Sequence, residues 1–298
     1  MAQPQPARKP PWLRRPLPPA GSVRLGRHLA GEGLHTVCHE AQCPNQGECL
    51  GRGVATFLIL GPICTRGCAF CAVTPGRPAP PDPGEPARLA QAVAGLGLRF
   101  VVITSVTRDD LPDGGAAHYA AVVAALGRQC PGVGVELLVP DFGGDPEALA
   151  LVLAARPQVL AHNLETVPRL YPSARAGADY ARSLDLLRRA KALAPQGLTK
   201  SGLMLGLGEE PAEVRAVLAD LRAAGCDCLT LGQYLAPSPA HLPVARYLTP
   251  QEFTELGDLA RAMGFVQVAS APLVRSSYLA EAGYRIARQA RTAGDQGR

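Results

Sequence analysis

The stretch VATFLILGPICTRGCAFC, residues 54–71, joins a mostly apolar run to a loop that carries three cysteines. The run is rich in Val, Ile and Leu and does not alternate strictly with polar residues, which is typical of a strand buried on both faces. The loop triplet is Cys64, Cys68 and Cys71, in C-x3-C-x2-C spacing. In folds built from parallel strands, active sites gather where strands end. The stretch therefore indicates an α/β fold with a thiol-rich site after its first strand.

Further β-rich runs follow, and alanine- and leucine-rich segments of helical length separate them. The predicted strands are 98–106, 133–140, 158–163, 198–205 and 228–234, and the predicted helices lie near 85–97, 115–129, 145–156, 177–194 and 209–224. One more helix near 250–263 precedes the run VQVAS at 266–270. Repeated βα units with parallel strands form a barrel or an open sheet. Six or so units are too few for eight strands, so we predict a partial (β/α)6 TIM-like barrel.

The predicted barrel leaves an extension at each end of the chain. We expect an N-terminal extension at 1–53, the barrel at 54–270 and a C-terminal extension at 271–298. Residues 1–31 contain basic residues and repeated prolines but no acid, which favours a solvated, extended arm. The prolines would interrupt the amphipathic helix of a transit peptide.

Composition excludes several classes of function. No run approaches eighteen apolar residues, so a membrane span is not expected. The net charge of +5 is dispersed and aromatic residues make up only 5%, which does not fit a nucleic-acid interface. We expect a cytoplasmic protein, because no signal region is seen and six cysteines would have to stay reduced.

Six of the nine cysteines form two triplets that are each one ligand short of a complete iron–sulfur site. The N-terminal triplet, Cys38, Cys43 and Cys49, has C-x4-C-x5-C spacing and precedes the loop triplet. A 4Fe–4S cluster normally takes four protein ligands, so three thiolates leave one iron open. Two triplets therefore predict two clusters, each with an open position.

Other uses of cysteine fit less well. An odd total in a long chain argues against a disulfide framework. Structural zinc usually takes two C-x2-C pairs, and among the six only Cys68 and Cys71 have that spacing. Zinc stays open as the alternative. Cys130, Cys226 and Cys228 lie outside the triplets, and we expect them to pack in the core as small hydrophobic residues.

Polar residues end several predicted strands, where the carboxyl ends of parallel strands would bring them to one rim. They are Thr104, Ser105, Asp109, Asp110, Asp141, His162, Asn163, Glu165, Lys200, Ser201, Gln233 and Tyr234. Each one taken alone is as well explained as a helix cap or a turn residue. Their common position favours a functional role for the set.

The loop triplet with Phe70 before its last cysteine resembles the signature of the radical S-adenosylmethionine (SAM) superfamily. The resemblance implies a 4Fe–4S cluster on Cys64, Cys68 and Cys71, with SAM as cosubstrate at the open iron. It also implies a partial barrel, in agreement with the predicted strands. The cosubstrate contacts that it suggests are Phe70, Thr104, Ser105, Asn163, Glu165, Lys200 and Met204.

Three further motifs narrow the resemblance to one family. The segments HTVCHEAQCPNQGECL (35–50), GQYLAPSPAHLPVARYLTP (232–250) and RSSYLA (275–280), together with the loop triplet, look like lipoyl synthases. That family inserts sulfur at C6 and C8 of an octanoyl group on a lysine of a lipoyl carrier domain. The implied partners are the E2 subunits of 2-oxoacid dehydrogenases, the H protein of glycine cleavage and a small redox protein that donates electrons.

The resemblance also assigns a fourth ligand to the auxiliary cluster held by Cys38, Cys43 and Cys49. That ligand is Ser277, whose oxygen is harder than a thiolate and suits a cluster that is to give up sulfur. From position alone, Ser276 and Ser277 would cap a helix that begins at Tyr278. The alternative functions are another two-cluster radical SAM enzyme, such as a methylthiotransferase, and a zinc-binding adaptor without activity.

Overall fold

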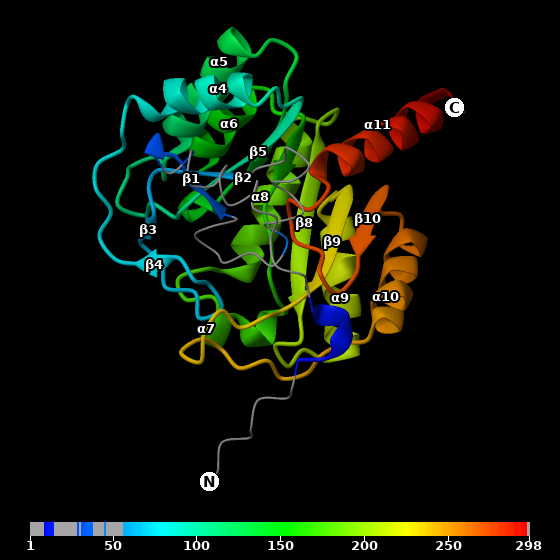
Figure 1. The fold of residues 1–298 in the computed structure, drawn as a ribbon. Coiled ribbons are helices and arrows are strands. Elements are labelled where there is room, and N and C mark those ends of the chain that lie inside the picture. The colour runs from blue at the N-terminus through cyan, green and yellow to red at the C-terminus, as the bar shows by residue number, and fades with distance from the viewer. Residues whose placement is uncertain (1–8, 15–28, 30, 38–44, 46–55, 297–298) are drawn as a thin grey trace.

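A mostly parallel sheet forms the centre of the molecule (Figure 1). The computed structural model describes residues 9–14, 29, 31–37, 45 and 56–296. The eight strands pair in the order β1-β2-β5-β6-β7-β8-β9-β10, and only the β1–β2 pair is antiparallel. Their bounds are β1 His35–Thr36, β2 Thr56–Ile59, β5 Phe100–Ser105, β6 Gly134–Leu138, β7 Val159–Ala161, β8 Leu198–Leu205, β9 Cys228–Gln233 and β10 Gln267–Ser270. The predicted α/β fold is confirmed, and the run at 266–270 adds a seventh parallel strand.

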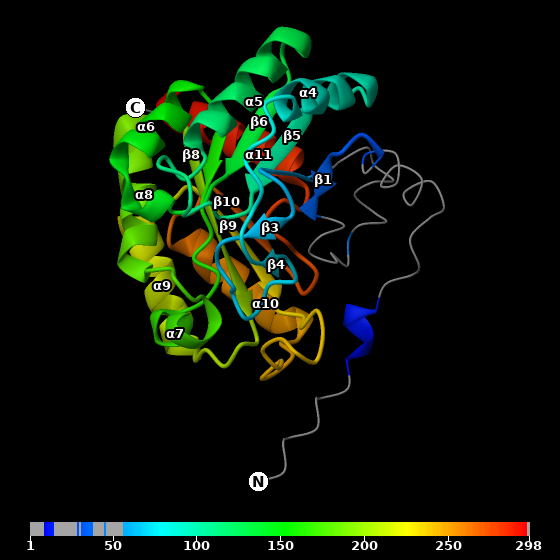
Figure 2. The ribbon, with the colours of Figure 1, turned by 90° about the vertical axis from the view of Figure 1, so that its left-hand side faces the viewer.

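Helices follow the parallel strands and cover the outside of the sheet (Figures 1 and 2). They are α4 Glu85–Gly95, α5 Ala116–Gln129, α6 Pro146–Ala154, α7 Tyr171–Ala174, α8 Tyr180–Leu193, α9 Pro211–Ala223, α10 Pro250–Ala262 and α11 Ala280–Gln296. Short 3-10 turns lie at η1 Pro11–Leu13, η2 Phe142–Gly144 and η3 Pro168–Leu170. The local sequence explains several helix starts: α6, α9 and α10 each begin with a proline, and Thr249 with Glu252 forms a capping box before α10.

Apolar side chains pack in two outer layers and one inner layer. One outer cluster joins α4, α5 and α6 to strands β2, β5 and β6, and the other joins α9 and α10 to β8 and β9. The inner cluster contains Phe100 of β5, Leu198 of β8 and Cys228 of β9, together with Ala280 and Ala287 of α11. Helix α11 thus closes the end of the barrel at which the strands begin, which leaves the opposite end for a site.

The three cysteines outside the triplets are used for packing, as predicted. Cys226 is fully buried in the outer cluster, and Cys228 lies in the inner one. The partly buried Cys130 packs against the outer cluster near α4, where its thiol donates to the carbonyl of Ala90 at 3.4 Å. None of the described helices is both long and apolar enough to cross a membrane.

Part of the N-terminal arm lies on the barrel, on the side away from α6, α8 and α9 (Figure 2). Leu13 is completely buried, and the indole nitrogen of Trp12 donates to the carbonyl of Leu248 at 3.2 Å. The expected extended, solvated arm is therefore wrong for residues 9–14. A buried leucine outweighs the solubility of its basic neighbours because it removes a large apolar side chain from water.

Leu13→Ala is expected to release this segment, because deleting a fully buried leucine side chain costs about 2–5 kcal/mol. Trp12 is the only tryptophan, so its fluorescence reports the docking directly. Trp12 is 39% exposed in the docked segment, and its emission should shift to longer wavelength when release exposes the rest of the indole. Leu193→Ala removes a leucine that is 57% exposed and serves as the matched control. An unchanged emission in Leu13→Ala would contradict the docked arrangement.

Candidate functional site

The loop triplet lies at the carboxyl end of the barrel and is fixed by its backbone. Cys64 belongs to β3 (Ile63–Cys64), which pairs with β4 (Thr74–Pro75). Within the loop, the amide of Thr65 donates to the carbonyl of Thr107 at 3.0 Å, and that of Ala69 to the carbonyl of Ala174 at 2.9 Å. The amide of Leu242 donates to the carbonyl of Ala69 at 2.9 Å. Three distant parts of the chain therefore set the path of the loop.

The three thiols are side chains of the kind that iron–sulfur clusters take as ligands. The Cys64 sulfur accepts the backbone amides of Arg66 and Thr107 at 3.4 and 3.3 Å, the kind of hydrogen bond that stabilises a thiolate. Burial raises the pKa of the Cys68 thiol to about 11, opposed by the charge of Arg175, and burial also raises the pKa of Cys71. Such thiols become ligands when a metal offsets the cost of the buried charge. Among the described residues, no three His, Cys, Asp or Glu side chains gather around one point as a single metal ion requires.

An ion-pair network holds the outer side of the loop. The guanidinium of Arg66 binds Asp109 at 2.7 and 2.8 Å and Asp141 at 2.8 and 3.0 Å. Arg182 binds Asp141 as well, at 2.8 Å. Burial acts to raise the pKa of Asp141, but the hydrogen bonds and charge of Arg66, with Arg182, hold it well below its usual range. Asp109 and Asp141, two of the strand-end acids, thus position Arg66, which lies between Cys64 and Cys68 in the loop.

A cavity of about 400 Å³ opens directly beside the loop. Phe70 and Cys71 line one part of it, and Asn163, Glu165 and Met204, at or beyond the ends of β7 and β8, line another. The segment 274–278, residues 234–237 and the N-terminal residues Lys9, Val37, Asn45 and Thr56 also contribute to the wall. Its volume lies within the range of about 300–1,000 Å³ that small-molecule sites occupy. The cavity therefore brings the loop triplet, the strand ends and the C-terminal serines to one place.

A chain of hydrogen bonds links the C-terminal serines to the strand ends. Ser276 donates to the amide oxygen of Asn163 at 3.0 Å, and the amide nitrogen of Asn163 donates to the carboxylate of Glu165 at 2.9 Å. Glu165 has φ of 66°, a conformation that is uncommon outside glycine, and its backbone amide and carbonyl bond to Gly202 and Met204 of β8. Burial raises the pKa of Glu165, and the charge of Arg175 opposes the rise. A half-buried carboxylate on a strained backbone that faces a cavity is a candidate for ligand binding.

Two glycines permit this close arrangement. A Cβ at Gly202 would lie 2.5 Å from the Thr230 hydroxyl oxygen and 3.0 Å from the amide oxygen of Asn163. A Cβ at Gly232 would lie 2.0 Å from the carbonyl oxygen of Val274. Any side chain at Gly232 would therefore push the segment 274–278 away from the cavity.

The cavity lining contains six residues of the predicted site. These are Phe70, Cys71, Asn163, Glu165, Met204 and Ser277. Cys64 and Cys68 lie in the same loop but not in the lining, and Cys38, Cys43 and Cys49 lie outside the described residues.

Three predicted cosubstrate contacts do not reach the cavity. The Thr104 hydroxyl donates to the carbonyl of Leu138 at 2.9 Å, and Ser105 is not in the lining. The ammonium of Lys200 is buried and binds both carboxylate oxygens of Glu136, at 2.8 and 3.0 Å. Their contacts with SAM stay predictions, and the lining of the cavity gives them no support.

Residues that the sequence did not single out also shape the site. Arg175 follows α7, acts on the pKa of both Cys68 and Glu165, and donates to the Tyr171 hydroxyl at 3.0 Å. The His241 ring lies 3.1 Å from the carbonyl of Cys71 and 2.8 Å from the Ser238 hydroxyl. Neither residue follows a strand directly, so the rule that sites gather at strand ends passes over both.

His162 gives this end of the barrel a pH dependence. It is fully buried, its Nδ1 lies 2.8 Å from the carbonyl of Val139, and burial, with the charge of Arg175, lowers its pKa to about 4. The unfolded chain takes up this proton near pH 6.5, before the folded one does, so stability is lost as pH falls from about 6.5 towards 4.

We expect the free energy of unfolding to drop by about 1 kcal/mol on this account between pH 7.5 and 5.5. Urea titrations at the two pH values measure the drop. In His162→Gln, the difference in the free energy of unfolding between pH 7.5 and pH 5.5 should be smaller by about 1 kcal/mol, whatever the absolute stability of the variant. An equal pH difference in both proteins would show that His162 is not the group responsible.

Comparisons with known proteins agree with the geometry. The radical SAM superfamily profile matches residues 58–221. The lipoyl synthase of Methylococcus capsulatus is 60% identical over 278 residues, covering 93% of this chain and 86% of that protein, and the lipoyl synthase of Geobacter sulfurreducens is 60% identical over 277 residues, covering 93% and 91%. The lipoyl synthase of Caldanaerobacter subterraneus is 53% identical over 94% of this chain and 99% of its own length.

Solved structures of distant proteins share the fold. Methylornithine synthase (PylB) superimposes with a TM-score of 0.53 at 15% identity, covering 71% of this chain and 70% of that one. The coproporphyrinogen III oxidase HemN of Escherichia coli gives a TM-score of 0.51 at 16% identity, covering 76% and 57%. At such low identity these matches concern the fold alone, and they agree with the predicted partial barrel.

Proposed function

The chain belongs to the lipoyl synthase family of the radical SAM superfamily, and we propose that the cavity beside Cys71 is the place where it inserts sulfur into an octanoyl group. The supporting observation is that this one cavity is lined by Cys71, by the hydrogen-bonded pair Asn163 and Glu165, and by Ser277. The relatives found by the comparisons are lipoyl synthases, and the two alternatives, a methylthiotransferase and a zinc-binding adaptor, are not supported by them.

Membership of the superfamily implies one 4Fe–4S cluster and SAM. We propose that Cys64, Cys68 and Cys71 hold this cluster, which when bound supplies the electron that cleaves SAM. Cys38, Cys43 and Cys49 are proposed as the thiolate ligands of an auxiliary cluster, with Ser277 as the fourth ligand. The proposed domains are 1–53, 54–270 and 271–298, so both extensions would contribute to the auxiliary cluster.

The chain's own residues then bind and orient the cosubstrate. Glu165 presents a carboxylate that suits the two hydroxyls of a ribose, and Asn163 fixes the direction of that carboxylate. Phe70 and Met204 supply apolar surface in the same cavity. Burial raises the pKa of Glu165, and the charge of Arg175 opposes that rise, so Arg175 favours the ionised carboxylate that accepts hydrogen bonds.

The substrate is proposed to be an octanoyl chain on a lysine of a carrier domain, which enters along residues 234–237. Leu235, Ala236 and Pro237 line the cavity there and offer the apolar surface that a hydrocarbon chain requires. The proposed carriers are the E2 subunits of 2-oxoacid dehydrogenases and the H protein of glycine cleavage, with a small redox protein as electron donor. We propose a cytoplasmic location, because cysteine ligands must stay reduced.

Incubation of the anaerobically reconstituted full-length chain with SAM, a strong reductant and an octanoylated carrier domain tests this function. The carrier should gain two sulfur atoms by mass spectrometry, and 5′-deoxyadenosine should accumulate with it. The same mixture without SAM is the control. Cleavage of SAM without any sulfur on the carrier would contradict the proposed substrate.

A further inference from the structure

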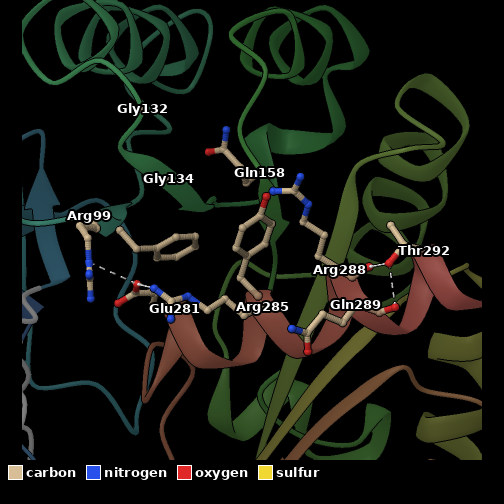
Figure 3. A pocket seen from close by; sticks show the side chains of 11 residues that line it. Arg99, Gly132, Gly134, Gln158, Glu281, Arg285, Arg288, Gln289 and Thr292 are labelled. Carbon is tan, nitrogen blue, oxygen red and sulfur yellow. Dashed lines mark hydrogen bonds and ion pairs between the residues drawn. The ribbon is translucent and has the colours of Figure 1, made fainter.

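A second cavity, of about 680 Å³, lies at the other end of the barrel from the cysteine loop. Its walls are the beginnings of β5 and β6, Gln158 just before β7, and the first turns of α11 (Figure 3). The cavity beside Cys71 is lined from the opposite ends of the strands and shares no lining residue with this one. The catalytic site therefore does not account for it.

The cavity is strongly basic. Arg99, Arg285 and Arg288 line it, and Glu281 is its one lining carboxylate. A single oxygen of Glu281 lies 2.5 Å from Arg285 and 3.8 Å from Arg99, so one acid is shared between two guanidinium groups. Within the described part of the chain, no acid pairs with Arg288. The cavity thus keeps an excess of positive charge.

A different arginine anchors the helix, which leaves these three available. Arg291 donates to the carbonyls of Gln196 and Gly197 and binds Asp227 at 3.0 Å, so its charge is used to hold α11 on the barrel. The side chains of Arg99 and Arg285 are 79% and 60% exposed and hold no such buried contact. Exposed arginines collected around a cavity are suited to bind an anion, because the guanidinium fork matches phosphate oxygens.

The floor of the cavity is aromatic. Phe100 and Tyr284 stack with ring centroids 5.3 Å apart and planes inclined by 30°. The Phe100 ring occupies the space where a Cβ of Gly134 would lie, at 2.4 Å, so the glycine is needed for this placement. Phe100 is buried, whereas Tyr284 is half-buried and contributes its ring to the lining. A partly open aromatic ring offers a stacking surface to a planar ligand.

We propose that this cavity is a binding site for an anion that carries two or more phosphate groups on a planar ring, the chemistry of a nucleoside diphosphate. The phosphates bind Arg285 and Arg288, with Arg99 at the other wall, and the planar ring lies against Tyr284. The volume fits, since ligand sites commonly measure about 300–1,000 Å³.

Isothermal titration calorimetry of the reconstituted full-length protein tests the site with ADP, pyrophosphate and adenosine as probes. Saturating SAM is present throughout, so the catalytic cavity is occupied. ADP should bind more tightly than pyrophosphate or adenosine. Arg285→Ala and Arg288→Ala should each weaken ADP about tenfold or more, as the loss of a charged hydrogen bond predicts.

Two further variants complete the test. Tyr284→Leu should reduce the affinity for ADP towards that for pyrophosphate, because only the stacking surface is lost. Arg215→Ala, which removes an exposed arginine of α9 that does not line the cavity, should leave ADP binding unchanged. Absence of heat with ADP in the presence of SAM, or equal affinities in Arg288→Ala and Arg215→Ala, would each overturn the proposal. SAM cleavage, measured in parallel, should stay unchanged in these variants and shows that they fold.

Discussion

Cys71→Ala is expected to abolish SAM cleavage. Cys71 lines the cavity, and its carbonyl and the neighbouring amides are already fixed, so the change removes a thiol without releasing the loop. Loss of residues that merely support metal ligands costs about 10–100-fold, and loss of a ligand should exceed that. The measurement is the rate of 5′-deoxyadenosine formation under strong reduction, together with the iron content.

The matched control is Cys130→Ala. Cys130 is also a partly buried cysteine, but it packs near α4 and lies far along the chain from the loop. Its variant should retain both SAM cleavage and the full iron content. Comparable losses in the two variants would mean that Cys71 acts through stability and not as a ligand.

Ser277→Ala should abolish sulfur insertion and leave SAM cleavage intact. The loop triplet is unchanged in this variant, so SAM is still cleaved, whereas the proposed oxygen ligand of the auxiliary cluster is gone and sulfur insertion is lost. The loss should again exceed about a hundredfold, as for any metal ligand. Mass spectrometry of the octanoylated carrier measures sulfur insertion, and the yield of 5′-deoxyadenosine measures SAM cleavage.

Ser276→Ala is the control that the structure provides. Its hydroxyl is committed to Asn163 at 3.0 Å, so its removal should weaken cosubstrate binding and raise the KM for SAM while sulfur insertion persists. Normal lipoyl formation by Ser277→Ala would exclude the ligand role. The capping role expected from position alone is wrong for Ser276, because α11 begins at Ala280 and not at Tyr278, and the Ser276 hydroxyl donates to Asn163.

The fold could be predicted from the sequence because its strands are buried on both faces. Runs such as 98–106 and 198–205 contain few polar residues, and the structure places β5 and β8 within them. Strand β10 was harder to predict, because the run at 266–270 is short and contains the polar residues Gln267 and Ser270. It is recognised by its parallel register with β9, which only the folded chain reveals.

The residues that line the cavity could be predicted where the side chain or its place after a strand is distinctive. The cysteine triplet is recognised by its spacing, and Asn163 and Glu165 are recognised because they follow a predicted strand. Lys200 shows the limit: it lies on β8, yet its side chain faces the barrel interior, where Glu136 neutralises it. Arg175 shows the opposite error, because it was missed although it influences the site. Arginine is a common residue and nothing in the local sequence marks this one; folding places its charge where it acts on the pKa of Cys68 and Glu165.

The bond from Ser276 to Asn163 has a thermodynamic consequence. The cosubstrate side of the cavity and the segment that carries Ser277 share one hydrogen-bonded amide, so they cannot change independently. Linkage is reciprocal: if SAM bound at Glu165 shifts the equilibrium of the segment, then the state of the segment shifts the affinity for SAM by the same factor. If Ser277 is a ligand of the auxiliary cluster, as proposed above, then loss of that cluster should change the dissociation constant for SAM through Asn163.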